Sequence, residues 1–191
     1  MDSIAAERIR SAAVKAFAES GYGGTSTRQI ANRLNMSPAA MYPHYRSKEA
    51  LLFAISQQGH CELLSALREV DDPGKTIGCR LSNVVRAFTV WQAENHELAR
   101  VVQYELNGLT PAHYRTVIAI RRDTTKVIAD IIHAGAESGE FDVDCAADVV
   151  LAISSLCVDV CRWFPTREQR DPKRLGTAYA GIVQRLVGAA S

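Results

Sequence analysis

The sequence predicts an all-α protein with a small N-terminal domain and a larger C-terminal one. Apolar residues recur three and four positions apart along most of its 191 residues, which is the spacing of one helix face. Ser, Thr or Asp stands before several of these stretches, and Gly or a Pro-Gly pair follows others, as expected where helices begin and end. After residue 70 we find helical patterns without a strand.

A first helix is predicted from about Ser3 to Ser20. Gly21 follows it in the C-cap position, where a residue without a side chain is favoured. The apolar residues of this helix share one face, which should pack across the two short helices that come next: Ile9, Ala13, Ala16 and Phe17.

The stretch from Ser26 to Glu49 reads STRQIANRLNMSPAAMYPHYRSKE and predicts two short helices and the start of a third. Ser26 and Gln29 have the spacing of a capping box at the start of a helix expected over 27–34. Asn35 follows, and Asn is one of the few residues that tolerates the left-handed conformation of a turn. A tight turn should therefore separate the first short helix from the second.

The second short helix is predicted over 38–45 and is the candidate recognition helix. Ser37 is its cap, and Pro38 is its first residue, where a missing amide hydrogen costs no helical bond. Pro43 lies inside the helix, where it removes a hydrogen bond and crowds the carbonyl four residues back, so we expect a kink or an early end. Two short helices joined by a tight turn are the outline of a helix-turn-helix, whose second helix enters the major groove of DNA.

Side chains suited to DNA gather in and beside these helices. Small residues at the start of the second helix let the backbone approach base edges, and alanine can touch a thymine methyl group. Arg28 is a long bidentate donor placed to reach a guanine edge. Hydroxyls at the start of the first short helix lie where amides favour a phosphate, and Tyr, His and Lys farther along suit phosphate contacts. The candidate DNA-binding residues are Ser26, Thr27, Arg28, Ser37, Pro38, Ala39, Ala40, Tyr42, His44 and Lys48.

The run from Phe17 to Leu52 resembles the N-terminal DNA-binding region of the TetR family of transcriptional regulators. The matching pieces stand at fixed offsets: Phe17, Gly21-Tyr22, Thr25-Ser26, Ile30-Ala31, Met36-Ser37, Tyr42, His44-Tyr45 and Ser47-Lys48. The resemblance implies three DNA-binding helices, with the third in the major groove, and then a dimeric ligand-binding domain. We therefore expect a DNA-binding helix-turn-helix domain over residues 1–46 and a ligand-binding and dimerisation domain over residues 47–191.

Charge is unevenly distributed along the chain. The net charge is +1, but residues 1–60 carry seven Lys and Arg against four Asp and Glu. A mildly basic N-terminal part suits a DNA-binding protein better than a general binder of polyanions. No apolar run is long enough for a membrane span, and the polar start MDSIAAERIR is unlike a secretory signal. We expect a cytoplasmic protein without a membrane partner.

The five cysteines form an odd set without close pairing, which favours reduced thiols: Cys61, Cys79, Cys145, Cys157 and Cys161. Cys157 and Cys161 stand one helical turn apart, so they are either a metal or redox pair or two small apolar core residues. The second interpretation is favoured because no His lies nearby in the sequence. We expect no metal site and no cofactor.

A long helix is predicted over 47–70, leading from the helix-turn-helix into the second domain. Such a helix is a natural lever, because a shift at one end moves the other end. Five more helices are expected, over 77–93, 96–106, 110–138 and 144–164 and in a last one opened by Asp171-Pro172.

The last two helices are predicted to form the interface of a homodimer. The helix over 144–164 is apolar on nearly all sides, so it must be covered on more than one face. Two such helices from each subunit form a four-helix bundle and present two recognition helices to a near-palindromic operator. The alternative is that the helix over 144–164 is the central core helix of a monomer. The last helix has an apolar stripe of Leu175, Tyr179, Ile182 and Leu186.

Aromatic and cationic residues of the second domain indicate where a small-molecule effector binds. Arg162 beside Trp163 offers a guanidinium and an aromatic face to a phosphate or an adenine ring. The alternative is that the tryptophans are core residues and the arginines are solvated. The candidate ligand-binding residues, suited to an amphiphilic anion, are Trp91, Tyr104, Tyr114, Arg121, Arg162 and Trp163. The second domain is also similar to TetR-family repressors of lipid and sterol breakdown that sense acyl-CoA thioesters, especially at 139–142 and 161–164.

Two classes of function fit these patterns. The first is a ligand-responsive DNA-binding regulator, specifically a repressor released by its effector. The second is a helical ligand-binding module or an enzyme that does not bind DNA. Catalysis is disfavoured because the sequence has no carboxylate pair, Cys–His pair or metal-ligand cluster at a working spacing. His60 and Cys61 are adjacent, so on a helix their side chains point about 100° apart.

Overall fold

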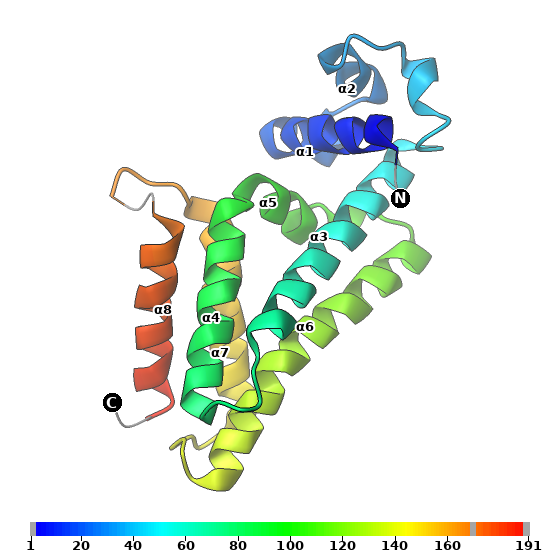
Figure 1. The fold of residues 1–191 in the computed structure, drawn as a ribbon. Helices are drawn as coiled ribbons and strands as arrows, with labels where there is room; N and C mark the ends of the chain where they lie inside the picture. The colour runs from blue at the N-terminus through cyan, green and yellow to red at the C-terminus, as the bar shows by residue number, and fades with distance from the viewer. Residues whose placement is uncertain (1–2, 169–170, 189–191) are drawn as a thin grey trace. The chain divides into compact units, whose positions relative to one another are not determined.

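The structure, a computed structural model, describes residues 3–168 and 171–188. In these ranges the chain is helical and has no strand, which confirms the all-α prediction (Figure 1). The chain forms two compact units, the first from Met1–His60 with Glu97–Ala119 and the second from Cys61–His96 with Ile120–Ser191. Over the same described ranges, no helix has the length and apolar character that crossing a membrane requires.

The helices follow the predicted order. The first four are α1 (Ile4–Gly24), α2 (Thr27–Arg33), the 3₁₀ helix η1 (Pro38–Met41) and α3 (Lys48–Val70). The others are α4 (Ile77–Glu94), α5 (His96–Tyr104), the 3₁₀ helix η2 (Leu106–Gly108), α6 (Pro111–Ser138), α7 (Ala146–Trp163) and α8 (Pro172–Leu186). Both α3 and α6 contribute residues to each unit.

The predicted caps are present at the two short helices. The Ser26 hydroxyl accepts a hydrogen bond from the Gln29 amide, and the Gln29 side chain accepts one from the Ser26 amide, which completes the capping box. The Ser37 hydroxyl accepts from the Ala40 amide at 3.3 Å. Asn35 has the left-handed φ of 53° expected for the turn between them.

The candidate recognition helix is shorter than the sequence predicted. It is a 3₁₀ helix that ends at Met41, whereas a helix over 38–45 was expected, so the second half of that prediction is wrong. The reason is Pro43, which has no amide hydrogen to donate to the carbonyl of Ala39. That carbonyl accepts from the Tyr42 amide instead, in the three-residue pattern of a 3₁₀ helix. The expected early end at Pro43 is confirmed.

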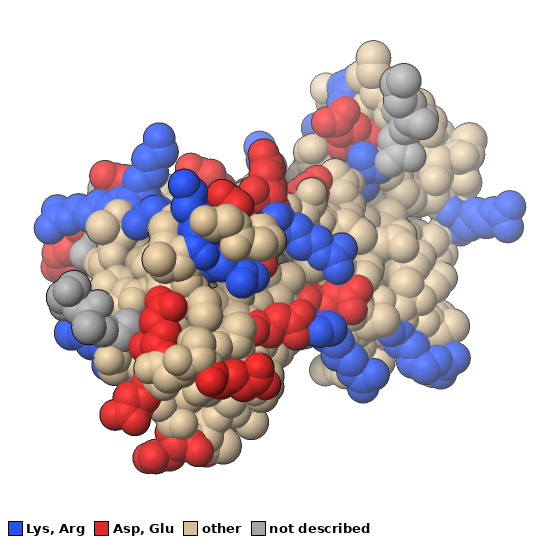
Figure 2. All heavy atoms as spheres, turned by 60° about the horizontal axis from the view of Figure 1, so that its bottom comes forward, with Lys and Arg blue, Asp and Glu red and all other residues tan. Residues whose placement is uncertain are grey.

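Charged side chains of both signs lie on the face of the protein that Figure 2 presents, where Lys and Arg occur together with Asp and Glu. This agrees with the net charge of +1. Any binding of a polyanion must therefore depend on a local group of residues rather than on the net charge.

The core of the first unit is made by one apolar cluster from α1, α2, η1, α3 and α5. The predicted face of α1 is buried in it, together with Ile30 and Ala31 of α2 and Met41 of η1. α3 contributes Leu51 and Leu52, which are fully buried. The two short helices are thus attached to the core by their buried residues, and their other faces are open to solvent.

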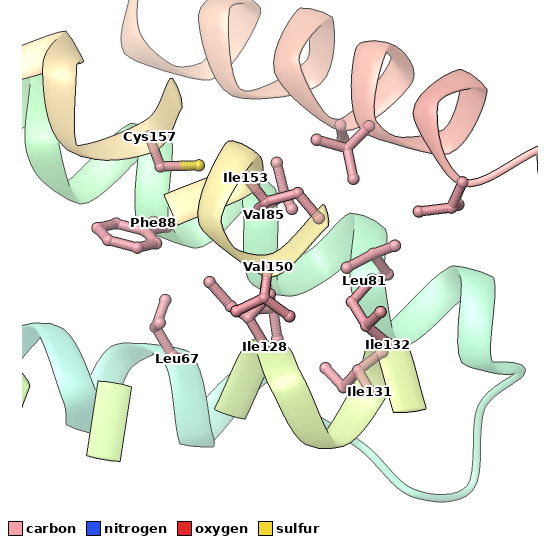
Figure 3. Packing of buried hydrophobic residues seen from close by; sticks show 14 of the residues in the cluster. Leu67, Leu81, Val85, Phe88, Ile128, Ile131, Ile132, Val150, Ile153 and Cys157 are labelled. Atoms are coloured by element: carbon pink, nitrogen blue, oxygen red, sulfur yellow. The ribbon is translucent and has the colours of Figure 1, made fainter. Parts of the chain in front are cut away.

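The core of the second unit lies among α4, α6, α7 and α8 and the C-terminal half of α3. α4 packs against both α7 and α8 (Figure 1). Cys157 lies in this core, where burial raises the pKa of its thiol to about 12 despite the nearby Thr89 hydroxyl. This supports the interpretation of Cys157 as a core residue. Figure 3 shows the packing of Leu67, Leu81, Val85, Phe88, Ile128, Ile131, Ile132, Val150, Ile153 and Cys157.

The first turns of α3 and α6 are joined in the first unit by the carboxylate of Glu49. Its Oε1 accepts a hydrogen bond from the Thr110 amide at 2.9 Å and lies 2.7 Å from His113 Nδ1. The His113 ring also stacks on Phe53, with ring centroids 3.8 Å apart. Burial of Glu49 opposes its ionisation, but the Thr110 amide and the His113 ring outweigh this and lower the pKa of the carboxyl group.

Replacing this carboxylate by Glu49→Gln should reduce the acid sensitivity of the fold. A carboxyl group whose pKa is lowered by folding stabilises the protein above its unfolded pKa of 4.5, and this contribution is lost as the pH falls through the folded pKa. Between about pH 5 and pH 3 the melting temperature of the wild type should therefore fall more steeply than that of Glu49→Gln. Melting curves across this range, with the exposed Glu69→Gln as control, test the effect. Parallel curves for wild type and Glu49→Gln would contradict it.

Candidate nucleic-acid interface

The ten predicted DNA-binding residues lie in α2, in η1, in the loops beside them and, for Lys48, at the first position of α3. None of the ten is buried. Ser26, Arg28, Ser37, Ala39, Tyr42 and His44 are exposed, and Thr27, Pro38, Ala40 and Lys48 are partly buried. These side chains are therefore accessible from solvent on the first unit.

Buried residues set the orientation of both short helices. In η1, Met41 is buried in the core, whereas its neighbour Tyr42 is 52% exposed. In α2, Ile30 and Ala31 are fully buried, and Arg28 projects from the exposed part of the same helix. Because the apolar residues of each helix are buried, its small and polar residues face solvent.

An open groove of about 430 Å³ lies at the start of α2. It is lined by hydroxyl, ammonium and backbone groups from Gly23, Gly24, Thr25, Ser26, Thr27, Gln29 and Lys48. Thr25 is buried, and its hydroxyl donates its one proton to the Gly21 carbonyl at 2.8 Å and also lies 3.1 Å from the Ala16 carbonyl. These groups are chemically suited to an anionic oxygen, as expected for a phosphate contact.

Lys48 has a structural role that the sequence did not reveal. Its ammonium donates to the carbonyls of Tyr22 and Thr25 at 2.8 Å each and lies 4.1 Å from the centroid of the Tyr22 ring. Two of its three donors therefore hold the last turn of α1 and the start of the loop to α2. The sequence analysis placed Lys48 among the phosphate contacts because of its residue type. It missed the structural role because the carbonyls that Lys48 meets lie 26 and 23 residues earlier in the chain.

The segment after η1 is attached to α1 by side chains that the prediction omitted. Arg10 Nη1 donates to the Tyr45 hydroxyl at 2.8 Å, and that hydroxyl donates to the carbonyl of Ala6 at 3.3 Å. His44 Nδ1 lies 3.3 Å from Ser3 Oγ. These contacts hold His44 and Tyr45 beside α1. The sequence carried one signal, the His44-Tyr45 pair within the family resemblance.

The six candidate ligand-binding residues divide between the two units. Tyr104 and Tyr114 belong to the first unit and are 52% and 43% exposed. The other four, Trp91, Arg121, Arg162 and Trp163, belong to the second unit. The six residues are therefore not assembled within a single unit.

Within the second unit, the two tryptophans and Arg162 lie in different surroundings. Trp91 is partly buried against the main core, and Trp163 is partly buried against Phe164, with ring centroids 6.3 Å apart. Arg162 is exposed and binds Asp159 through two hydrogen bonds of 2.6 and 2.8 Å, and the hydrogen bond from Arg162 lowers the pKa of Asp159. An anionic ligand of Arg162 would have to compete with that carboxylate.

Comparison with known proteins places both parts of the chain in one family. A model described as bacterial regulatory proteins of the TetR family matches residues 9–55. A model of the tetracyclin repressor-like C-terminal domain matches residues 74–187. The two matches thus cover the helix-turn-helix and most of the remaining chain.

Individual proteins agree with this assignment. A TetR-family regulatory protein from Rhodococcus RHA1 has a crystal structure with a TM-score of 0.95 and 47% identity, covering 99% of this chain and 100% of that one. The transcriptional repressor KstR2 of Mycobacterium tuberculosis H37Rv is 27% identical over 172 residues, 87% of this chain and 84% of that protein. The structure of AibR in complex with isovaleryl coenzyme A and operator DNA shares the fold, with a TM-score of 0.85 at 20% identity over 97% of this chain and 99% of that one.

The fold, the capped helix-turn-helix and the family matches lead to one conclusion. The C-terminal model alone covers more than half of the chain, and the N-terminal model covers α2 and η1. The chain belongs to the TetR family and is a DNA-binding transcriptional regulator rather than an enzyme.

Proposed function

We propose that this regulator is a homodimeric repressor of a near-palindromic operator, released from DNA by an acyl-CoA or another lipid-derived anion. We assign DNA binding to residues 1–46 and effector binding and dimerisation to residues 47–191. One observation carries the proposal. The burial of Met41, Ile30 and Ala31 fixes the orientation of η1 and α2, so that the small and polar residues of these helices face solvent.

The geometry of η1 supports base reading at close range. Ala39 is exposed and Ala40 is partly buried, and neither has a side chain that would keep the backbone away from base edges. Arg28 is exposed in α2 and has the reach to bind a guanine edge through two hydrogen bonds. The hydroxyls of Ser26 and Ser37 cap their helices, so the neighbouring backbone amides are held in place for phosphates.

Arg28→Ala should weaken operator binding by ~1–3 kcal/mol and relax the preference at one base pair in each half-site. The operator is first obtained by selecting bound DNA from a random pool, which also tests for inverted symmetry. Gel shifts at one fixed salt concentration then compare wild type, Arg28→Ala and, as control, Lys126→Ala, which removes an exposed cation paired with Asp130 in α6. An unchanged base preference in Arg28→Ala would remove the base-reading role, and selected sites without inverted symmetry would argue against a dimer on DNA.

Exposed apolar side chains on α7 and α8 support a dimer through these helices. Leu151 of α7 is 66% exposed, and Ile182 and Leu186 of α8 are 43% and 47% exposed. Of the predicted stripe on α8, Leu175 is buried in the second unit, whereas Ile182 and Leu186 face solvent. α7 also has a buried face, as the alternative interpretation of a core helix required, but a core role leaves Leu151 unexplained. Association around a two-fold axis would cover these residues.

The double variant Leu151→Glu/Ile182→Glu should be a monomer, because each new carboxylate would be buried without a partner at the interface. Sedimentation at micromolar concentration measures the mass of wild type and variant. Ile4→Glu serves as control, since Ile4 is 80% exposed in α1 and outside the proposed interface. A monomeric wild type, or a double variant that still sediments as a dimer, would refute the assignment.

Control by a lipid-derived anion is supported by chemistry and by similarity. Trp163 and Arg162 adjoin at the end of α7 and offer an aromatic face and a guanidinium. The relative KstR2 is a repressor, and AibR was crystallised with isovaleryl coenzyme A and operator DNA. A coupling of ~1–3 kcal/mol between the effector and DNA would be enough to switch operator occupancy.

The start of α3 provides a physical connection for this coupling. Lys48 holds the loop that precedes α2, and the adjacent Glu49 holds the first turn of α6 through Thr110 and His113. α6 continues from this turn into the second unit as one helix. A displacement of α6 on effector binding would thus act on the loop that positions α2.

Arg162→Ala should raise the acyl-CoA concentration needed for DNA release by roughly twofold to fivefold, the range expected for an exposed ion pair. Release is measured by titrating acyl-CoA into the protein–operator complex. Lys173→Ala, which removes an exposed cation near the start of α8, is the control. Release of wild type and Arg162→Ala at the same acyl-CoA concentration would remove Arg162 from the effector site.

A further inference from the structure

We propose that Gln92 of α4 determines effector specificity. It would select effectors whose buried, otherwise apolar part carries a neutral keto, hydroxyl or amide group over effectors with a plain saturated chain. This inference rests on the proposed function of an effector-controlled regulator and narrows the chemical class of the effector.

The side chain of Gln92 is a buried amide without a hydrogen-bond partner. Gln92 is 0% exposed, and in the part of the chain that the structure describes neither Oε1 nor Nε2 has a partner. A primary amide offers two donors and an acceptor, and burying it unpaired is costly. The buried hydroxyl one turn earlier differs, because Thr89 Oγ1 donates to the Val85 carbonyl at 2.8 Å.

A second buried polar group lies on the helix that faces α4. Ser154 Oγ of α7 is also inaccessible and has no partner among residues 3–168 and 171–188. The two helices meet where Thr89 Oγ1 lies 3.7 Å from Cys157 Sγ. Gln92 follows Thr89 by three residues and Ser154 precedes Cys157 by three, so each shares a helix face with the contact between α4 and α7. Polar groups thus flank this contact along both helices.

The surroundings of Gln92 indicate which group would satisfy it. Phe88, one turn earlier on the same face, belongs to the main apolar cluster (Figure 3). The adjacent Ala93 belongs to a second cluster with Val160 and Phe164. Both clusters consist of hydrophobic residues. A carboxylate or phosphate buried against them would lose its hydration. A neutral oxygen or amide group meets the hydrogen-bonding needs of Gln92 without that cost.

Specificity follows from the unpaired amide. A site built to hydrogen-bond a polar group rejects the analogue that lacks it, because the amide of the protein then stays buried and unpaired. We expect a preference of about tenfold or more for an oxygenated effector over its saturated analogue. Gln92→Met keeps a similar length and volume but removes the amide, so it should abolish or reverse that preference.

The test compares full-length wild type, Gln92→Met and the control Thr89→Val, which removes a buried hydroxyl that already has a partner. Two matched pairs of probes are used: 12-hydroxystearoyl-CoA with stearoyl-CoA, and the uncharged 5α-androstan-17-one with 5α-androstane. Calorimetry measures the affinity of each probe, thermal melting measures the stability of each variant, and gel shifts measure release of the operator.

The expected result is a wild type and Thr89→Val that both prefer the oxygenated member of at least one pair. Gln92→Met should lose the preference and melt no lower than wild type. The inference is overturned if wild type has no preference in either pair, including the case in which it binds no probe. It is also overturned if Gln92→Met keeps the wild-type preference, because the amide then serves the fold alone. Preference in binding without operator release would instead refute the proposed effector control and leave the role of Gln92 intact.

Discussion

The first turn of α3 is the point on which the arrangement of the first unit depends. Lys48 donates to the carbonyl of Tyr22, which follows the break at Gly21 in the last turn of α1, and to that of Thr25, which follows α1. Glu49 accepts from the amide of Thr110, which precedes α6. Backbone groups at helix ends lack partners within their own helix, so they need such side chains. Because the two residues are consecutive, a single helical turn fastens both the loop before α2 and the start of α6. The same turn therefore stabilises the first unit and forms the proposed link between the effector and the DNA-binding helices.

The candidate recognition helix, η1, is short for a local chemical reason. Pro43 cannot donate to the carbonyl of Ala39, so η1 closes as a 3₁₀ helix and ends at Met41. The residues that follow are held by contacts with α1, through Arg10 and Tyr45. Only a few side chains of η1 can therefore reach base edges. Recognition would rely correspondingly more on Arg28 and on the shape of the DNA.

The second unit combines an apolar core with a small number of polar exceptions. Cys157 and Cys161 are fully buried, and Cys157 is kept protonated by its surroundings, which fits a packing role. Gln92 and Ser154 are different, because the side-chain amide of Gln92 and the hydroxyl of Ser154 are buried without hydrogen-bond partners in the described structure. Buried polar groups of this kind weaken a fold unless a partner satisfies them, and the effector that we propose would satisfy Gln92.

The sequence by itself determined the fold class, the order of the helices and the capped helix-turn-helix, because these depend on local signals. Capping boxes, a left-handed Asn35 and the early end at Pro43 involve residues within a few positions of each other. Only the tertiary structure decided the role of Lys48, the Glu49–His113 contact and the isolation of the Gln92 amide. Lys48 looks like a phosphate contact in the sequence, and its carbonyl partners lie 26 and 23 residues earlier. Whether a buried amide has a partner depends on which helices surround it, and that is a property of packing that periodicity does not encode.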